Sequence, residues 1–384
     1  MSFMPASLEA YLAMDVIQEQ LDVIVPGLPR PLPEGYYKAV DRDGQRWGAD
    51  LTVGNRQLAP TVPQEAPAPA MPKQAADQRY WGMMTPKFHD FYTPSKLMQL
   101  RKLGATQQDK LAKSYVARTI ADNLQRWQNT RTAAVHRVLC GSGILYFDVD
   151  GNLLADATGA VVTIDQSPPT TNTTRGKDMA GSNIIGTAWN NVAAPIPEDL
   201  AKIQQVAVQR TGHRLTTAVY GNNIPYLLLA NTAVKGLFPG TFQNIASAFA
   251  MGGIPAGFLG IANWVKGNEA FWFDASGYYG GQKPTTDPFA AALHQEVADN
   301  ALVLLPDAGS GYYELAQGQT VIPITNDIIG ANEDIIEEGF VTAQGQYGYG
   351  FVSKDPVGVK VIFGDTFLPA LSVLGARWNL TPVF

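Results

Sequence analysis

The sequence predicts an α+β fold in which extended pieces project from a body of helices and short strands. Three observations lead to this class. A helical period runs without proline from residue 106 to 139, short strand-like runs bounded by glycine fill the second half of the chain, and proline-rich stretches occupy 25–35 and 58–73. Because proline fixes φ and removes a backbone donor, those two stretches cannot continue a helix or the interior of a sheet. We therefore expect them to lie outside the compact body.

The first 88 residues are expected to form an arm and an extended loop. Residues 7–21 follow an amphipathic helical pattern that ends at the prolines, so residues 1–35 are assigned to an N-terminal arm. Residues 36–88 contain turn signals and the second proline-rich stretch, and a segment this long without regular structure is either disordered or covered by a partner. Because residues 79–92 are rich in aromatic side chains and methionine, we interpret 36–88 as an extended loop whose root packs on the body.

One long helix and a small hairpin are predicted next, within a peripheral domain assigned to residues 89–190. Apolar residues recur at spacings of three to five from 106 to 139, which gives a single helix of about 50 Å. Thr106 is suited to cap its start, and arginines near its end complement the helix dipole. Residues 143–166 then read as short strands separated by Asp-Gly and Thr-Gly turns, which predicts a hairpin.

Residues 191–350 are predicted to form a mixed α/β domain. A helix begins at Pro197, where a missing N–H is tolerated, and ends at Gly212. A strand at 215–221 and a second helix around 224–235 follow it, and further strands are predicted at 270–274, 301–305 and 320–324. Residues 351–384 are expected to return to the core as strands.

Composition and charge exclude several functional classes. The net charge is −6 and no basic face is evident, which argues against a dedicated nucleic-acid binder. Charged residues make up only 16% of the chain, so much of the surface is expected to be covered by other chains. Cys140 is the single cysteine, which rules out an intrachain disulfide and favours a reducing compartment. No apolar run is long enough to span a bilayer and no secretory signal is evident, so we expect a cytoplasmic protein without membrane contact.

The motifs of common enzymes and metal sites are not found in the sequence. There is no Walker loop and no nucleophile elbow, and the four histidines lack the helical zinc spacing. The run from Asp148 to Asn152 lacks the glycine and the carboxylate that a calcium loop needs, so it is interpreted as a turn. We therefore predict no enzyme activity, no catalytic residue, no cofactor and no metal. An α/β hydrolase or transferase with a scattered site stays open as an alternative, because scattered groups leave no motif.

An acidic run at 332–338 has two interpretations. Like charges four residues apart repel each other on a helix, so the run is interpreted first as a solvated face. Alternatively, Glu333 and Glu337 take part in an ion pair or a cation site between subunits.

The order of the expected elements resembles the HK97-fold major capsid protein of tailed bacteriophages, most closely the lambda-type branch. RQLAPTVPQEAPAP (56–69) is similar to the loop segment of that family. TRTAAVHRVLCGSGILY (130–146) is similar to the point where the family's spine helix runs through a glycine turn into a strand. The most specific match is PEDLAKIQQVAVQRTGHRLTTAVYGNNIPYLLLANTAVKGLF (197–238), which is similar to a helix, strand and second helix of the family's axial domain. The Gly-rich, aromatic stretch at 240–290 departs from the pattern.

The resemblance implies a structural function. A capsid protein of this family assembles as pentamers and hexamers into an icosahedral shell around the phage double-stranded DNA, which it contacts weakly and without sequence specificity. Its implied partners are copies of itself, a scaffolding protein, a portal and a decoration or cement protein; its implied location is the virion, after assembly in the bacterial cytoplasm. The shell of an encapsulin-type nanocompartment and another phage structural protein are alternatives. By their positions, the following residues are candidate contacts between subunits: Trp47, Arg56, Tyr80, Trp81, Glu333 and Glu337.

Overall fold

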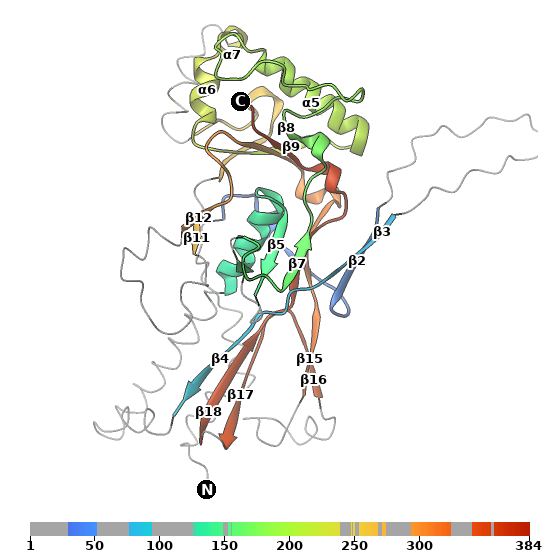
Figure 1. Cartoon of the computed structure of the whole chain (residues 1–384), viewed down its shortest axis with the longest axis vertical. Helices are drawn as coiled ribbons and strands as arrows, with labels where there is room; N and C mark the ends of the chain where they lie inside the picture. The colour runs from blue at the N-terminus through green and yellow to red at the C-terminus, as the bar shows by residue number, and fades with distance from the viewer. Residues whose placement is uncertain are drawn as a thin grey trace, which may run out of the picture.

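The computed structural model is elongated, with a helix-bearing unit at one end and β-ribbons at the other (Figure 1). It describes residues 30–51, 77–93, 125, 127–148, 153–154, 156–238, 247, 249, 253–267, 271–273, 293–323, 340–354 and 357–384. The predicted arm up to residue 29, the loop at 52–76, the first part of the long helix and the acidic run at 332–338 lie outside these residues.

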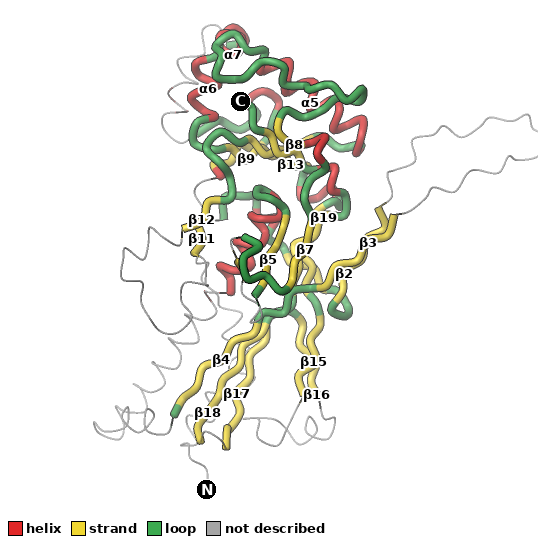
Figure 2. Tube along the Cα trace, in the orientation of Figure 1, coloured by secondary structure: helices red, strands yellow, loops and turns green. Residues whose placement is uncertain are grey.

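Two hydrophobic cores organise the described residues, and we call them the upper and the lower core after their places in Figure 1. The upper core lies under three helices, which are α5 (Ile196–Thr211), α6 (Ile224–Ala230) and α7 (Thr232–Leu237). The lower core contains the end of the long helix, which is helical over 127–139, together with the strands around it. Figure 2 shows that helices are concentrated in the upper part and strands in the lower part. The mixed α+β class predicted from the sequence is confirmed.

A five-stranded sheet separates the two cores. Its strand order is β10-β9-β13-β20-β8, with bounds Asn263–Lys266, Leu215–Tyr220, Leu302–Pro306, Trp378–Leu380 and Thr173–Thr174. Successive side chains of a strand point to opposite faces. In β13, Leu302 and Leu304 accordingly belong to the upper core, whereas Val303 and Leu305 belong to the lower core. This strand is therefore apolar at every position because both of its faces are buried.

The helix α5 has the ends that the sequence predicts. Pro197 occupies its first turn, Glu198 and Asp199 lie near its positive end, and Gly212 closes it in the left-handed region at φ 84°. The predicted second helix is divided in two at Asn231, whose backbone is extended and whose side chain accepts a hydrogen bond from the Val234 N–H at 3.0 Å. An Asn at this position caps the start of α7 and so ends α6.

The lower core holds two three-stranded sheets. The first has the order β6-β5-β7 and forms the small antiparallel unit predicted at 143–166; its strands are Leu153–Leu154, Ile144–Phe147 and Val162–Asp165. The second has the order β1-β14-β19, with bounds Ala39–Asp41, Tyr313–Gln317 and Phe367–Leu371. Strand β1 is parallel to β14, and β19 is antiparallel to it.

Three ribbons extend from the lower core. Strands β2 (Arg46–Leu51) and β3 (Asp77–Gly82) form the base of the predicted extended loop. Strands β15 (Gln319–Pro323) and β16 (Phe340–Gln344) form a second ribbon. The third has the order β17-β18-β4, with bounds Tyr347–Lys354, Val357–Gly364 and Lys87–Tyr92. Figure 1 shows all three pointing away from the body.

Several short elements connect these parts. A two-stranded pair is formed by β11 (Phe271–Phe273) and β12 (Leu293–Gln295). Five 3₁₀ turns complete the described elements: η1 (Glu34–Tyr36), η2 (Thr170–Asn172), η3 (Phe258–Gly260), η6 (Ala308–Ser310) and η7 (Leu374–Ala376).

The structure draws two predicted domain boundaries differently. The mixed α/β unit does not run continuously from 191 to 350, because the strands from β14 to β17 belong to the lower core or to the ribbons. The arm does not extend to residue 35, because Leu32 and Tyr36 are buried in the lower core. In both cases long-range contacts set the boundary, and local sequence patterns carry little information about them.

Candidate interaction surfaces

The tip of β9 carries no reactive group. The Gly221 that follows this strand lies so close to a neighbouring turn that a Cβ there would approach the Ala298 carbonyl oxygen to 2.1 Å. The Asn222 amide donates to the Asp299 carboxylate at 2.9 Å, and the Asn223 amide donates to the Asn300 side-chain oxygen at 2.8 Å. The strand end is therefore filled by the chain's own turn. Among the described residues, no group of three or more His, Cys, Asp or Glu side chains is arranged to hold a metal ion.

Two of the three ribbons have no strand beside them apart from their own partner, within the described residues. Among the described residues, β2 pairs with β3 alone and β15 pairs with β16 alone. A two-stranded ribbon is at best marginally stable in water unless something packs on it. On β15 the Val321 side chain is 56% exposed, although valine is usually buried. The ribbons therefore provide surfaces that a partner would complete.

All three ribbons meet at one place, which we call the ribbon root and define as residues 42–45, 83–84, 317–319, 344–345 and 364–367. The Gln319 N–H donates to the Gly44 carbonyl at 3.0 Å, and the Gly345 N–H donates to the Gly318 carbonyl at 2.8 Å. The side-chain amide of Gln344 donates to the carbonyls of Arg42, at 3.1 Å, and Gln317, at 2.8 Å. The first ribbon is thus hydrogen-bonded to the start and the end of the second.

Gly318 makes the close packing of the ribbon root possible. A Cβ at this position would lie 2.4 Å from the Met83 sulfur and 2.8 Å from the Gly44 carbonyl oxygen. Such distances are well inside van der Waals contact, so any side chain would push the first and second ribbons apart.

The long helix is tied to the same root. The Arg131 guanidinium donates two hydrogen bonds to Asp365, from Nε to Oδ2 and from Nη2 to Oδ1, each at 2.6 Å. The Asp365 side chain is only 1% exposed. The Arg131 guanidinium also lies 5.3 Å from the centre of the Phe367 ring. Trp127 is 3% exposed and contacts Phe363 of β18 edge-on with ring centres 6.2 Å apart, so the helix also packs against this strand.

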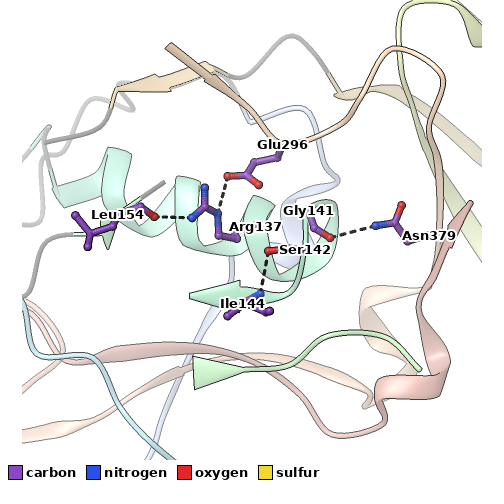
Figure 3. A network of polar contacts seen from close by, with 7 residues as sticks. All are labelled: Arg137, Gly141, Ser142, Ile144, Leu154, Glu296 and Asn379. Atoms are coloured by element: carbon purple, nitrogen blue, oxygen red, sulfur yellow. Dashed lines mark hydrogen bonds and ion pairs between the residues drawn. The ribbon is translucent and has the colours of Figure 1, made fainter. Parts of the chain in front are cut away.

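The end of the long helix is joined to three separate elements (Figure 3). Arg137 donates to the Glu296 carboxylate at 2.8 Å and to the Leu154 carbonyl at 2.6 Å. The Asn379 amide, which comes from β20, donates to the Gly141 carbonyl at 3.2 Å. The Arg137 and Glu296 side chains are 6% and 9% exposed, so this ion pair is buried at the junction of the two cores.

Arg377 completes this junction from the C-terminal segment. Its guanidinium donates to the carbonyls of Val138 and Ser142, where a helix end leaves carbonyl groups without intrahelical partners. Burial lowers the pKa of Arg377 to about 10, which leaves the group charged at neutral pH. Burial also raises the pKa of the nearby Cys140 thiol to about 12, so this cysteine is a packed side chain without thiolate reactivity.

The structure brings together two of the predicted contact residues and leaves three undescribed. Trp47 and Trp81 pack against each other at the base of the first ribbon, with ring centres 5.4 Å apart and ring planes tilted by 34°. Trp47 is 6% exposed in the lower core, and the half-buried Trp81 donates to the Asp165 carbonyl at 3.3 Å, so both fix the ribbon to its own body. The backbone of Tyr80 lies opposite Gly48 in the same ribbon. Arg56, Glu333 and Glu337 lie outside the described residues.

A further apolar surface at the upper end of the molecule was not predicted from the sequence. Tyr226 on α6 is 71% exposed, and Leu237 on α7 and the nearby Val192 are also exposed. Val192 lies beside the start of α7, because the N–H and the hydroxyl of Thr232 both donate to the Val192 carbonyl at 2.8 Å. Ile224 and Leu228 are buried, and Tyr226 lies between them in sequence on the other face of α6. This spacing was the available signal for its exposure.

Comparisons with known proteins give matches at the level of structure only. No family model matches the chain, and no curated protein matches its sequence. A phage-related protein from Bordetella bronchiseptica RB50 is similar over 97% of each chain, with 8% identity and a TM-score of 0.47. The capsid asymmetric unit of cyanophage A-1(L) is similar over 93% of each chain, with 11% identity and a TM-score of 0.43. A putative prophage capsid protein from E. coli CFT073 is similar over 80% of this chain and 79% of that one, with 13% identity and a TM-score of 0.42.

No helix in the described part of the chain combines the length and the apolar character that crossing a bilayer requires.

Proposed function

We propose that this chain is a major capsid protein of a tailed bacteriophage and forms the icosahedral shell around the genome. The observation that carries the proposal is the contrast between closed cores and ribbons that leave them. Three ribbons share one root, and two of them are two-stranded over the described residues. A subunit of a lattice needs such pieces, because each copy completes its neighbours' surfaces. The role is structural, and its partner of first importance is another copy of the same chain.

The element order of the described residues supports this reading. The base of an extended loop precedes the end of a long helix, a small three-stranded sheet follows, and a mixed α/β unit with its helices on one side comes next. The last strand then returns to the central sheet. This is the order expected from the resemblance to the HK97 fold.

Each surface has a proposed role in the shell. The first ribbon and the loop beyond it lie over one neighbour. The exposed apolar surface on α6 and α7 faces the centre of a pentamer or hexamer, where copies of this surface meet. Scaffolding, portal and decoration proteins are proposed as further partners, and contact with the enclosed DNA is weak and salt-dependent because the chain is acidic. Assembly takes place in the bacterial cytoplasm and the product resides in the virion.

Electron microscopy of the purified full-length protein tests the proposal. We expect closed shells, or rings of five and six copies, and we expect a variant lacking residues 55–75 to keep its fold and to form no closed particle. Normal particles from the deletion variant would contradict the role of the loop. A homogeneous monomer at high protein concentration would contradict the shell function itself. Shells that enclose a protein cargo in cells would assign the nanocompartment alternative instead.

A further inference from the structure

The segment that leads into the body, residues 30–37, is packed on the lower core. Leu32 is 3% exposed and Tyr36 is 1% exposed, and the Tyr36 hydroxyl donates to the Pro306 carbonyl on the central sheet. The Arg30 guanidinium lies 5.3 Å from the centre of the Tyr37 ring. The residues before Arg30 are therefore connected to the body through this segment.

A polar side-chain contact joins the segment to the described end of the long helix. The Tyr37 hydroxyl oxygen lies 2.7 Å from Nε2 of His136, and the two rings meet edge-on with their centres 6.0 Å apart. His136 is 5% exposed and lies one helical turn before Cys140. The Tyr37 oxygen also accepts a hydrogen bond from the Leu32 N–H at 3.3 Å. The contact therefore closes a small loop of the segment and fixes it to the helix at the same time.

The direction of this hydrogen bond depends on the protonation of Nε2. With Nε2 unprotonated, the Tyr37 hydroxyl donates to it and accepts from the Leu32 N–H, so the hydroxyl has both an acceptor and a donor as partners. Protonation puts a hydrogen on Nε2 and turns it into a donor. The Tyr37 oxygen then faces two donors, and its own hydrogen loses its acceptor. A buried donor without an acceptor is unfavourable, so the closed arrangement is weakened by a change in one proton.

The surroundings of His136 give little compensation for a positive charge. A small pocket beside it is lined by Pro31, Cys140 and Glu296. The Glu296 carboxylate accepts from Arg137, the Cys140 thiol is neutral, and the Arg30 guanidinium over the Tyr37 ring is itself positively charged. The buried Arg377 adds a further positive charge at the same helix end. Burial lowers the pKa of His136 to about 4.

We propose that Tyr37 and His136 form an acid-sensitive latch, which holds residues 30–37 on the long helix at neutral pH and releases them when the imidazole is protonated. The latch acts within one copy of the chain, so it does not depend on the proposed shell function. Its consequence is that Leu32 and Tyr36 leave the lower core in the released state, while the upper core and β13 stay folded.

The direction of the effect follows from where the proton binds more tightly. Where release exposes the imidazole to water, its pKa returns to the ordinary value of about 6.5, whereas burial lowers it to about 4 in the latched state. The released state therefore gains protons first as the pH falls below about 6.5. The ratio of released to latched molecules rises about 30-fold between pH 7.5 and pH 5, and it stops rising below about pH 4.

Hydrogen exchange of the full-length protein, read by mass spectrometry and corrected for the intrinsic rate at each pH, tests the latch. The wild-type protein should lose protection in residues 30–37 between pH 7.5 and pH 5, while peptides from β13 stay protected. His136→Gln removes the titration and should make the protection of residues 30–37 independent of pH. The same substitution at His213, an exposed histidine that contacts Tyr312 edge-on at 4.9 Å, should leave the wild-type response unchanged.

A second variant covers the case in which His136→Gln fails to fold. Tyr37→Phe keeps the ring and removes the hydroxyl, so residues 30–37 should exchange faster already at pH 7.5 and respond less to acid. Protection in the wild type that is equal at pH 7.5 and pH 5 would overturn the proposal. An equal loss of protection in wild type and His136→Gln would overturn it as well, since another group would then be responsible.

Discussion

Strand β13 and the ribbon β15–β16 follow each other closely in the chain and have opposite surroundings. In β13 every residue from Leu302 to Leu305 is fully buried, with alternate side chains in the upper and the lower core. In β15 the neighbouring Val321 and Ile322 are 56% and 3% exposed, so one face of the ribbon is open. The two faces of β13 are therefore covered by the chain's own side chains, whereas one face of the ribbon is exposed. We take this difference as the physical basis of the proposed lattice role.

The largest effect is expected at the junction of the two cores. Arg137→Met removes the charged partner of Glu296 and leaves a buried carboxylate, which should lower the free energy of unfolding by about 3–5 kcal/mol. The double variant Arg137→Met, Glu296→Leu should recover most of that loss, because neither position then carries a buried charge without its partner. Urea unfolding of the three proteins measures both values. A single-variant loss below about 1 kcal/mol would show that the junction does not hold the cores together.

A pair of apolar truncations compares the body with the ribbon directly. Leu304→Ala should lower the free energy of unfolding by about 2–5 kcal/mol, because Leu304 is fully buried and a cavity is left. Val321→Ala removes exposed methyl groups and should change it by less than about 0.5 kcal/mol. Denaturant titration of both variants and the wild type under the same conditions measures the two changes in the free energy of unfolding. Similar losses for both variants would mean that the ribbon is as well packed as the central sheet.

The ribbon root should give an intermediate effect. Gly318→Ala places a methyl group against Met83 and the Gly44 carbonyl, and it should cost about 1–3 kcal/mol. Gly82→Ala is the matched control, since no atom lies within 4 Å of the added Cβ. Thermal or urea unfolding would show the difference. If the two alanines behave alike, the ribbons are not held at a common root.

The smallest effect on stability should accompany a large effect on assembly. Val321→Asp changes an exposed side chain of the ribbon and should alter the free energy of unfolding by no more than about 1 kcal/mol. If a neighbouring copy covers this residue, the buried charge should prevent closed particles, whereas Val321→Thr should permit them. Particle yield by electron microscopy distinguishes the variants. Normal assembly of Val321→Asp would place this face outside the contacts between copies.

Local chemistry made part of the fold predictable. Pro197 and Gly212 mark the two ends of α5 because each acts through its own backbone geometry. The strand at 301–305 was found because a strand buried on both faces is a continuous apolar run. The sequence did not predict that Asn231 divides the second helix into α6 and α7. An asparagine can also occupy the interior of a helix, and its role as the cap of α7 is evident only from the structure.

Contacts between distant residues set the limits of prediction. The pairing of β1 with β14 and the bond between Tyr37 and His136 join residues far apart in the chain, and no local pattern indicates either. Trp47 and Trp81 were identified as interface aromatics from their types, and their placement at the base of a ribbon depended on a pairing that only the structure gives. The search for enzyme motifs in the sequence tested only the spacing of residues along the chain. The closed tip of β9 at Gly221 adds the geometric reason at that position.

Hydrogen exchange of the same full-length protein before and after assembly tests the central claim most directly. We predict that β2–β3 and β15–β16 exchange quickly in the unassembled chain and become strongly protected in the particle, while β13 is equally protected in both. Ribbons that are already as protected as β13 in the unassembled chain would contradict the account, because nothing would then be left for a neighbouring copy to complete.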